Sequence, residues 1–236
     1  MGVGDAGGSG EVRLAALVPS YNAAASVGEV VRGVLPMLAP VVVVDDGSAD
    51  ATGAAAAAAG ATVVTHDVNR GKGAALMTGF RHLAAERFTH ALTLDADGQH
   101  LPHEIPKLIA ATRSDPRALV VGVRQKTGHE IRGINLVGNW VADRVMTVIA
   151  GTVLPDTQSG FRVYPLAATL ALGASGSRFD FETEILLRAA RGGIPLRGVP
   201  VEVHYPPVAE RVSHYRPLVD TVRIVRTIGR VAFRRS

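Results

Sequence analysis

Short apolar runs alternate along the chain with longer segments in which apolar residues recur every three or four positions. The runs predict β-strands and the longer segments predict amphipathic helices, because side chains repeat every 2 residues in strands and every 3.6 in helices. The predicted strands are residues 13–18, 41–44, 61–65, 90–94 and 119–123. The predicted helices are residues 23–38, 49–59, 73–86, 102–113, 135–150 and 181–191. This alternation predicts an α/β fold, a Rossmann-like and mostly parallel sheet flanked by helices.

Acidic residues follow two of the predicted strands. The run 41–44 consists of four valines, as expected for a strand buried on both faces, and it leads into Asp45 and Asp46. The strand at 90–94 leads into Asp95-Ala96-Asp97. Because ligands bind outside the carboxyl ends of the strands in open α/β sheets, we expect both acidic groups at one crevice.

The chain divides into three predicted parts. Residues 1–11 are Gly-rich and predict a flexible tail without the apolar segment of a signal peptide, residues 12–210 predict one α/β domain, and residues 211–236 predict a basic loop and C-terminal helix. No uncharged stretch reaches the roughly 18 residues that a membrane-spanning helix needs. We therefore expect a cytoplasmic protein.

The positive charge is concentrated at the C-terminus. Residues 211–236 hold seven arginines and one aspartate, a net charge of +6, whereas the whole chain carries +4. Two interpretations of this amphipathic segment stay open: a helix docked on the domain, or a helix lying on an anionic membrane surface. Aromatic residues make up only 5% of the chain, and a local basic patch is weak evidence for nucleic-acid binding, so no nucleic-acid partner is expected. The chain has no cysteine, which excludes thiolate metal sites and cysteine nucleophiles.

The segment after the fourth predicted strand has the pattern of a metal site. Asp95 and Asp97 repel each other unless a cation lies beside them, and Gln99 adds a neutral oxygen two residues further on. Such oxygen ligands suit Mg²⁺ or Mn²⁺. The alternative is a solvated turn with Gly98 at positive φ.

Two further segments carry candidate binding groups. Asp45 and Asp46 precede Gly47 and are either ordinary turn residues or acceptors for a ribose or base edge. The Gly-rich segment 69–73 contains Lys72 and opens a predicted helix, whose first N–H groups suit an anion.

Two histidines, His100 and His103, follow the acidic motif. The first is expected near the metal. Zinc is not expected at this pair, because the sequence shows no second arrangement of carboxylate and histidine typical of a zinc site.

Taken in order, these motifs resemble the family 2 glycosyltransferases of the GT-A fold. The residues that carry the resemblance are Pro19-Ser20-Tyr21-Asn22, Asp45-Asp46-Gly47-Ser48, Asn69-x-Gly71-x-Gly73 and Asp95-Ala96-Asp97-Gly98-Gln99-His100. Two later runs, 156–162 and 178–182, resemble the polyprenyl- or dolichyl-phosphate mannosyl- and glucosyltransferases. The resemblance covers roughly residues 13–216. The chain departs from the family at Ala23, where Glu is frequent, and in lacking the transmembrane helices that many members append.

The resemblance implies a role for each matching position. The nucleotide-binding residues would be Pro19, Tyr21, Asn22, Asp45, Asp46, Lys72, Asp95 and Ala96, with Asp45 supporting the end of its strand. The metal ligands would be Asp95, Asp97 and Gln99. The residues near the sugar and acceptor phosphate would be Ser159, Gly160, Arg162, Arg211 and Ser213. The catalytic residues would be Asp97, Arg124, Asp180 and Glu182.

The implied reaction is metal-dependent, inverting transfer of glucose or mannose from a UDP- or GDP-hexose to a polyprenyl phosphate, at the inner face of the membrane. A lipid phosphate is already ionised near pH 7, whereas a hydroxyl acceptor needs a general base, for which Asp180, Glu182 and Glu184 are candidates. The alternatives are transfer to another lipid or hydroxyl, nucleotidyl transfer, and a nucleotide-binding module that docks on membranes without catalysis.

Overall fold

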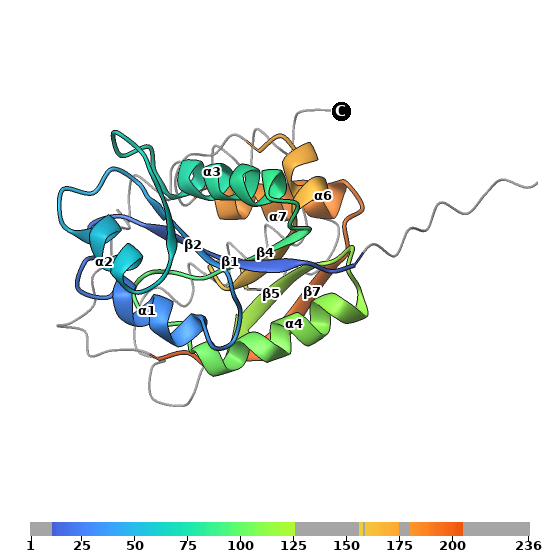
Figure 1. Cartoon of the computed structure of the whole chain (residues 1–236). Coiled ribbons are helices and arrows are strands. Elements are labelled where there is room, and N and C mark those ends of the chain that lie inside the picture. Colours follow the sequence, from blue (N-terminus) through green and yellow to red (C-terminus); the bar gives the residue numbers. More distant parts are fainter. Residues whose placement is uncertain (1–10, 126–155, 158, 175–179, 205–236) are drawn as a thin grey trace, which may run out of the picture.

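Seven strands form one sheet in the order β3-β2-β1-β4-β6-β5-β7 in the computed structural model (Figure 1). The structure describes residues 11–125, 156–157, 159–174 and 180–204. The strands are β1 Leu14–Ser20, β2 Val41–Asp45, β3 Thr62–Thr65, β4 His90–Thr93, β5 Leu119–Arg124, β6 Arg162–Pro165 and β7 Leu196–Val201. The helices are α1 Val27–Val34, α2 Thr52–Ala58, α3 Lys72–Ala85, the 3-10 helix η1 Pro102–Glu104, α4 Ile105–Ser114, α6 Leu166–Ala171 and α7 Asp180–Arg191. The predicted α/β class with a mostly parallel sheet is confirmed.

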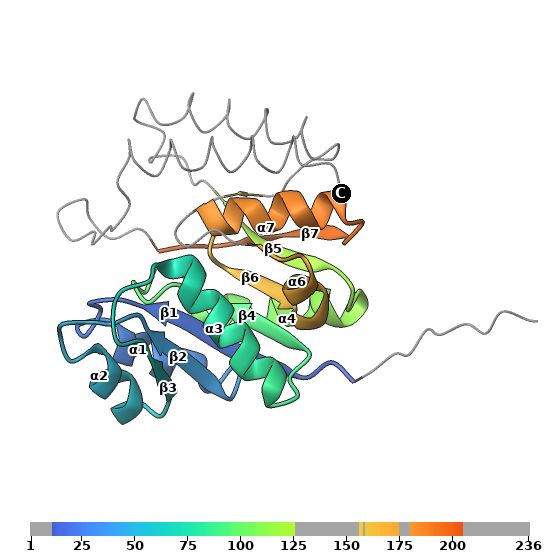
Figure 2. The ribbon, with the colours of Figure 1, turned by 90° about the horizontal axis from the view of Figure 1, so that it is seen from above.

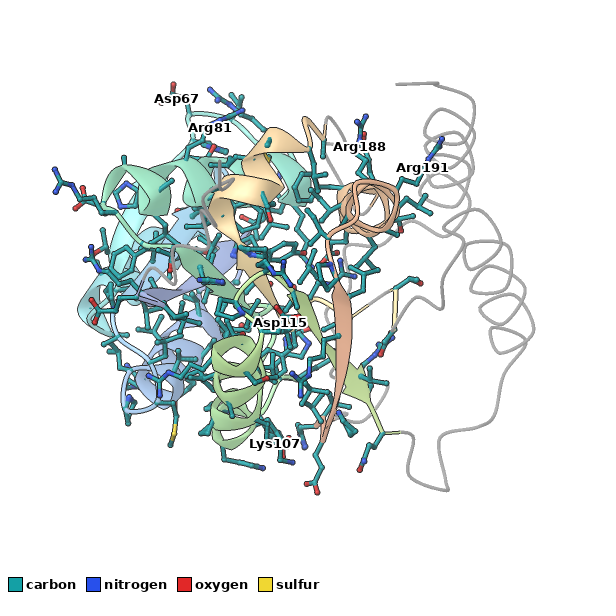
Figure 3. The ribbon with its side chains drawn as sticks, turned by 90° about the vertical axis from the view of Figure 1, so that its right-hand side faces the viewer. Asp67, Arg81, Lys107, Asp115, Arg188 and Arg191 are labelled. Atoms are coloured by element: carbon teal, nitrogen blue, oxygen red, sulfur yellow. The ribbon has the colours of Figure 1, made fainter. Side chains whose placement is uncertain are left out.

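Helices cover both faces of the sheet, and each face has its own hydrophobic cluster (Figures 1 and 2). Helices α1, α2 and α4 pack on one face, and α3, α6 and α7 pack on the other. In β2, Val41 and Val43 join the first cluster while Val42 and Val44 join the second. The valine run is therefore buried on both faces, as predicted from its lack of polar positions. Figure 3 shows the outer edges of these layers, with Lys107 on α4 and with Arg188 and Arg191 on α7.

All five predicted strands are present, with ends shifted by at most two residues. Two more strands, β6 and β7, were not predicted. β6 is only four residues long and begins with a buried arginine, Arg162. β7 contains Gly198 and Pro200 and is exposed at half of its positions, so it has no continuous apolar run. β6 also runs antiparallel between β4 and β5, an exception to the parallel pattern.

The helix boundaries differ more than the strand boundaries. Helix α1 begins at Val27 instead of residue 23, because residues 23–26 form a hydrogen-bonded turn in which the Ser26 N–H donates to the Ala23 carbonyl. The predicted helix at 135–150, the predicted basic loop and helix at 211–236, and residues 1–10 of the predicted tail lie outside the described residues. In the part that the structure describes, no helix is both long and apolar enough to cross a bilayer.

A fully buried guanidinium joins β6 to its surroundings. Arg162 donates hydrogen bonds to the backbone carbonyls of Ser159 at 2.7 Å, Thr157 at 2.8 Å and Glu182 at 2.8 Å. It also lies 3.4 Å from the Tyr164 hydroxyl. One side chain thus fixes the loop before β6 and the first turn of α7, two segments that border the site described below.

Replacing this guanidinium tests its structural role. We expect Arg162→Met to lower the free energy of unfolding by about 3 kcal/mol, because it leaves buried carbonyls without donors. Arg113→Met is the matched control, since Arg113 is exposed on α4 and its loss changes stability by less than about 0.5 kcal/mol. Urea denaturation measures both variants, and equal stability of the two would contradict the assignment.

Candidate active site

The acidic segments predicted from the sequence meet at one edge of the sheet. β1 pairs in parallel with β2 on one side and β4 on the other, so the carboxyl ends of all three strands lie together. Asp45 and Asp46 continue β2, and Asp95 follows β4. Backbone hydrogen bonds extend the alignment beyond the strands: the Asp46 N–H donates to Ser20 and the Leu94 N–H donates to Leu17.

Lys72, the first residue of α3, is paired with two carboxylates. Its ammonium lies 2.6 Å from Asp95 Oδ1 and 3.1 Å from Glu182 Oε1. Burial alone would raise the pKa of Asp95, but the charge and hydrogen bond of Lys72, together with the other positive charges nearby, outweigh it and lower that pKa to about 2. Burial alone would lower the pKa of Lys72, and the two carboxylates reverse this and raise it. Both groups are therefore charged at neutral pH.

The rest of the acidic loop is more open. Asp97 is exposed, and its Oδ1 accepts a hydrogen bond of 3.0 Å from the Gln99 N–H. Desolvation, and then the negative charge of Asp95, raise the pKa of Asp97. The backbone of Ala96 helps to hold this loop in place, because its carbonyl accepts a 2.6 Å hydrogen bond from the Ser26 hydroxyl.

His100 supports this loop through a hydrogen bond and a ring contact. Its Nδ1 accepts a 3.1 Å hydrogen bond from the Asp95 N–H, and its ring stacks on Phe161 with centroids 5.1 Å apart. Burial lowers the pKa of His100, so the ring is neutral with its proton on Nε2. The His204 N–H donates to the Gln99 carbonyl at 2.8 Å, which ties the loop to the segment after β7.

Gly160 lies directly against the Asp95 carboxylate. A Cβ built at this position would come within 2.6 Å of Asp95 Oδ2, so any side chain here would displace the carboxylate. The close approach holds Asp95 beside the exposed Asp97 and the partly exposed Gln99. Carboxylate and amide oxygens at this sheet edge are the donor set that Mg²⁺ or Mn²⁺ prefers, so these residues fit a divalent cation.

The Asp46 carboxylate is bound by groups of the protein itself. Its carboxylate is buried and accepts hydrogen bonds from His66 Nδ1 at 2.6 Å, the Arg70 N–H at 2.9 Å and the Gly71 N–H at 2.7 Å. His66 Nε2 in turn lies 2.9 Å from the Thr78 hydroxyl on α3. Protein donors engage both oxygens, so Asp46 in this structure positions the loop before α3 rather than facing a base or ribose. The sequence pattern gave no signal for His66.

The loops after β1 and β2 are linked to each other. Asn22 has φ of 49°, its Oδ1 accepts from the Ala49 N–H at 2.9 Å, and its N–H donates to Ser48 Oγ at 2.9 Å. Asp45 Oδ1 accepts from the Ser48 N–H at 3.0 Å, which fixes the turn after β2. Pro19 is buried within β1, and Tyr21 is partly exposed beside these loops.

Arg124, at the end of β5, forms a two-pronged ion pair with Asp156. The Nε atom of Arg124 lies 2.7 Å from Asp156 Oδ2, and its Nη2 atom lies 2.8 Å from Asp156 Oδ1. Burial would raise the pKa of Asp156, and the hydrogen bonds and charge of Arg124 lower it overall. Asp156 was not among the predicted site residues, although it stands in a motif that carries the resemblance.

The predicted acceptor residues separate into two groups. Gly160 lies at the site, as described, whereas Ser159 and Arg162 are buried and bonded to the protein itself. These two residues support the site in this structure instead of facing a ligand. Arg211, Ser213 and the side chain of Asp180 lie outside the described residues.

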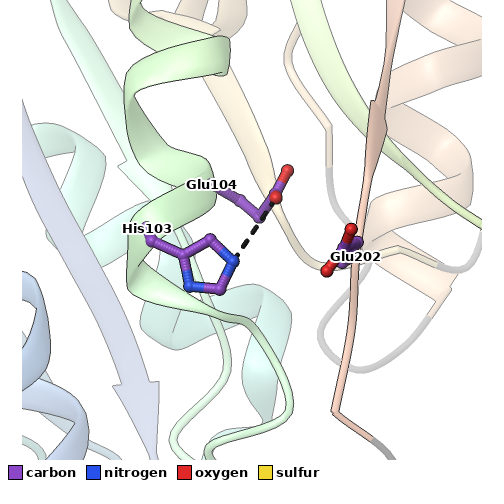
Figure 4. Close-up of side chains that lie close together, drawn as sticks. All are labelled: His103, Glu104 and Glu202. Atoms are coloured by element: carbon purple, nitrogen blue, oxygen red, sulfur yellow. Dashed lines mark ion pairs between the residues drawn. The ribbon is translucent and has the colours of Figure 1, made fainter.

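A second group of possible metal ligands lies at the start of α4 (Figure 4). The ligand atoms of His103, Glu104 and Glu202 lie within 4.8 Å of one another, and His103 Nε2 is 3.5 Å from Glu104 Oε1. Lys107 already supplies a positive charge, 2.7 Å from Glu104 Oε2. We assign no metal to this group.

The packing of Gly160 against Asp95 allows a direct test of whether Asp95 is held in place to bind a metal ion. We expect Gly160→Ala to weaken Mn²⁺ binding by about tenfold, because the added methyl group displaces the Asp95 carboxylate. Gly28→Ala is the matched control, since its Cβ would meet mainly the flexible end of Arg32. Calorimetric titration with Mn²⁺ measures both, and unchanged binding in folded Gly160→Ala would contradict the arrangement.

Comparisons with known proteins agree with this geometry. Residues 15–170 match the family model described as Glycosyl transferase family 2. The chain is 30% identical over 195 residues to the uncharacterized protein MJ1222 of Methanocaldococcus jannaschii, with 80% of each chain covered. It is 29% identical over 210 residues to the undecaprenyl-phosphate mannosyltransferase of Micrococcus luteus, covering 80% of this chain and 83% of the relative.

A solved structure of similar shape is glucosyl-3-phosphoglycerate synthase from Mycobacterium tuberculosis in complex with Mn²⁺, UDP-glucose and phosphoglyceric acid. It aligns with a TM-score of 0.70 and 22% sequence identity, covering 95% of this chain and 81% of that chain. The alignment shows a shared GT-A fold. Together with the family match, it identifies the chain as a glycosyltransferase that belongs to glycosyl transferase family 2.

Proposed function

We propose that this glycosyltransferase moves glucose or mannose from a nucleotide-sugar to a polyprenyl-phosphate carrier, with inversion at the anomeric carbon. The observation that carries the proposal is the Asp95 carboxylate, held between Lys72 and Gly160 at the carboxyl ends of parallel strands and next to exposed Asp97. The name of the Micrococcus luteus relative supports a lipid-phosphate acceptor. The Mn²⁺ and UDP-glucose complex of the structural neighbour supports the donor class and the cofactor.

The chemistry centres on the leaving group. As the bond from the anomeric carbon to the diphosphate breaks, negative charge accumulates on the diphosphate oxygens. Asp95, Asp97 and Gln99 would hold a Mg²⁺ or Mn²⁺ ion, which would supply the Lewis acidity that neutralises this charge. Lys72 and Arg124 lie at the same sheet edge with partly exposed side chains, and their cationic groups add charge-assisted hydrogen bonds to phosphate.

The proposed acceptor removes the need for a general base. A phosphate monoester is ionised near neutral pH, so orienting its oxygen toward the anomeric carbon is sufficient. Glu182, expected as a catalytic residue, has a side chain only 7% exposed and paired with Lys72. These contacts favour a positioning role for Glu182 over proton abstraction.

A lipid-linked acceptor places the reaction at a membrane surface. Residues 211–236 carry seven arginines and include the predicted phosphate contacts Arg211 and Ser213. Basic residues near an anionic leaflet each add about 1 kcal/mol of attraction. On this ground, we also propose that the enzyme binds peripherally at the inner face of the membrane.

Calorimetric titration with UDP and GDP, each with and without Mn²⁺, tests the donor site. We expect one nucleotide to bind in a metal-dependent manner, and Asp97→Asn to weaken that binding by about tenfold or more through loss of a metal-binding charge. Asp115→Asn, at the C-terminal end of α4, is the matched control and binds as the wild type does. Failure of both nucleotides to bind under every condition would refute the nucleotide-sugar assignment.

Transfer itself is measured with the donor that binds and with undecaprenyl phosphate in detergent. We expect a lipid-linked hexose of inverted anomeric configuration. Hydrolysis of the donor without lipid product, or transfer only to hydroxyl acceptors, would contradict the proposed acceptor.

A further inference from the structure

One ammonium group pairs with two carboxylates in the proposed donor site. Lys72 comes from the start of α3, Asp95 from the loop after β4 and Glu182 from α7, so three distant segments meet at this point. The side chains of Lys72 and Glu182 are only 18% and 7% exposed, respectively. The resemblance assigns Lys72 to nucleotide binding and leaves its relation to Asp95 and Glu182 undefined.

The position of this ammonium conflicts with a divalent ion at the same oxygen. Lys72 Nζ is 2.6 Å from Asp95 Oδ1, which is the distance of a direct ion pair. A divalent ion bound to that oxygen would lie close enough to the ammonium for strong repulsion. Lys72 must therefore move away from Oδ1 when a metal binds there.

Asp95 has little freedom to move instead. Its second oxygen, Oδ2, lies against Gly160, where even a methyl group would come within 2.6 Å. Its backbone N–H is held by His100. The long, flexible side chain of lysine is the mobile partner of the pair.

Glu182 provides a place for the displaced ammonium. Its Oε1 is already 3.1 Å from Lys72 Nζ, and its carbonyl is fixed by the buried Arg162 at 2.8 Å. An ammonium that leaves Asp95 remains paired with Glu182, which avoids the penalty of an unpaired buried charge. A diphosphate arriving with the metal supplies further negative charge for the same ammonium.

We propose that Lys72 is an internal counter-ion that opposes metal binding at Asp95 in the free enzyme, so that metal and nucleoside diphosphate bind together. Glu182 is a positioning residue in this exchange, because it acts on the metal site through Lys72. The inference rests on the proposed donor site. It adds a reason why this enzyme would hold little metal before its nucleotide arrives.

Two substitutions have opposite expected effects. Lys72→Met removes the competing cation, so Mn²⁺ without nucleotide binds about tenfold more tightly, while nucleotide with Mn²⁺ binds more weakly. Glu182→Gln leaves the ammonium with Asp95 as its remaining carboxylate in this group, so Mn²⁺ without nucleotide binds about tenfold more weakly. A purely structural role for these residues would weaken Mn²⁺ binding in both variants.

The experiment measures free Mn²⁺ by electron paramagnetic resonance at pH 8, with wild-type protein, Lys72→Met and Glu182→Gln. Arg32→Met is the matched control, because Arg32 also pairs with a glutamate but lies on the surface of α1, and it binds Mn²⁺ as the wild type does. Circular dichroism verifies that each variant is folded. If Lys72→Met does not fold, Lys72→Gln, which also removes the positive charge, takes its place.

The outcomes separate this inference from the function on which it rests. Tighter Mn²⁺ binding by Lys72→Met, or by Lys72→Gln in its place, together with weaker binding by Glu182→Gln, supports the counter-ion. Equal or weaker Mn²⁺ binding by folded Lys72→Met, or equal or tighter binding by Glu182→Gln, overturns it even when the wild type binds UDP or GDP with Mn²⁺. If the wild type binds neither nucleotide with Mn²⁺, the proposed function fails, and with it the inference.

Discussion

The hydrogen bonds of the buried Arg162 guanidinium hold together the part of the site that parallel strands do not supply. Parallel β1, β2 and β4 bring the acidic loops to one edge, but they do not fix what faces those loops. Arg162 binds carbonyls on the segment before β6 and on α7. It thereby sets Gly160 against Asp95 and Glu182 against Lys72.

Charged side chains of the site are paired with one another before any ligand arrives. Lys72 is paired with Asp95 and Glu182, and Arg124 is paired with Asp156. Pairing allows these groups to stay ionised in partly buried positions. A nucleoside diphosphate with its metal brings both signs of charge, so its binding is an exchange of ionic partners rather than the addition of charge to a neutral surface.

The sequence predicted the features that depend on local pattern and topology. The valine run of β2 and the apolar run of β4 identified two central strands, and the rule for parallel sheets placed Asp45 and Asp95 at one edge. The features that were missed depend on contacts between distant residues. Burial of Arg162 and the bond between Asp46 and His66, 20 residues apart, leave no periodic signal.

The same limit applies to the protein partners of two charged groups. The resemblance implies ligand contacts for Asp46 and Arg162, and the sequence shows no sign of the protein groups that bind them. In the structure, protein donors and acceptors engage both groups, and each positions a neighbouring segment instead. The sequence likewise did not predict that His103 lies close to Glu202, which is 99 residues further along the chain.

A crystal structure with Mn²⁺ and the nucleoside diphosphate that binds is the most direct test of the central claim, which is that the metal and donor site is built around Asp95. Anomalous scattering from manganese locates the ion independently of the surrounding atoms. The account predicts manganese bound to the carboxylates of Asp95 and Asp97 and to the diphosphate, with Lys72 moved away from Asp95 and still paired with Glu182. Manganese at His103, Glu104 and Glu202, with Lys72 unmoved and no ion at Asp97, would contradict it.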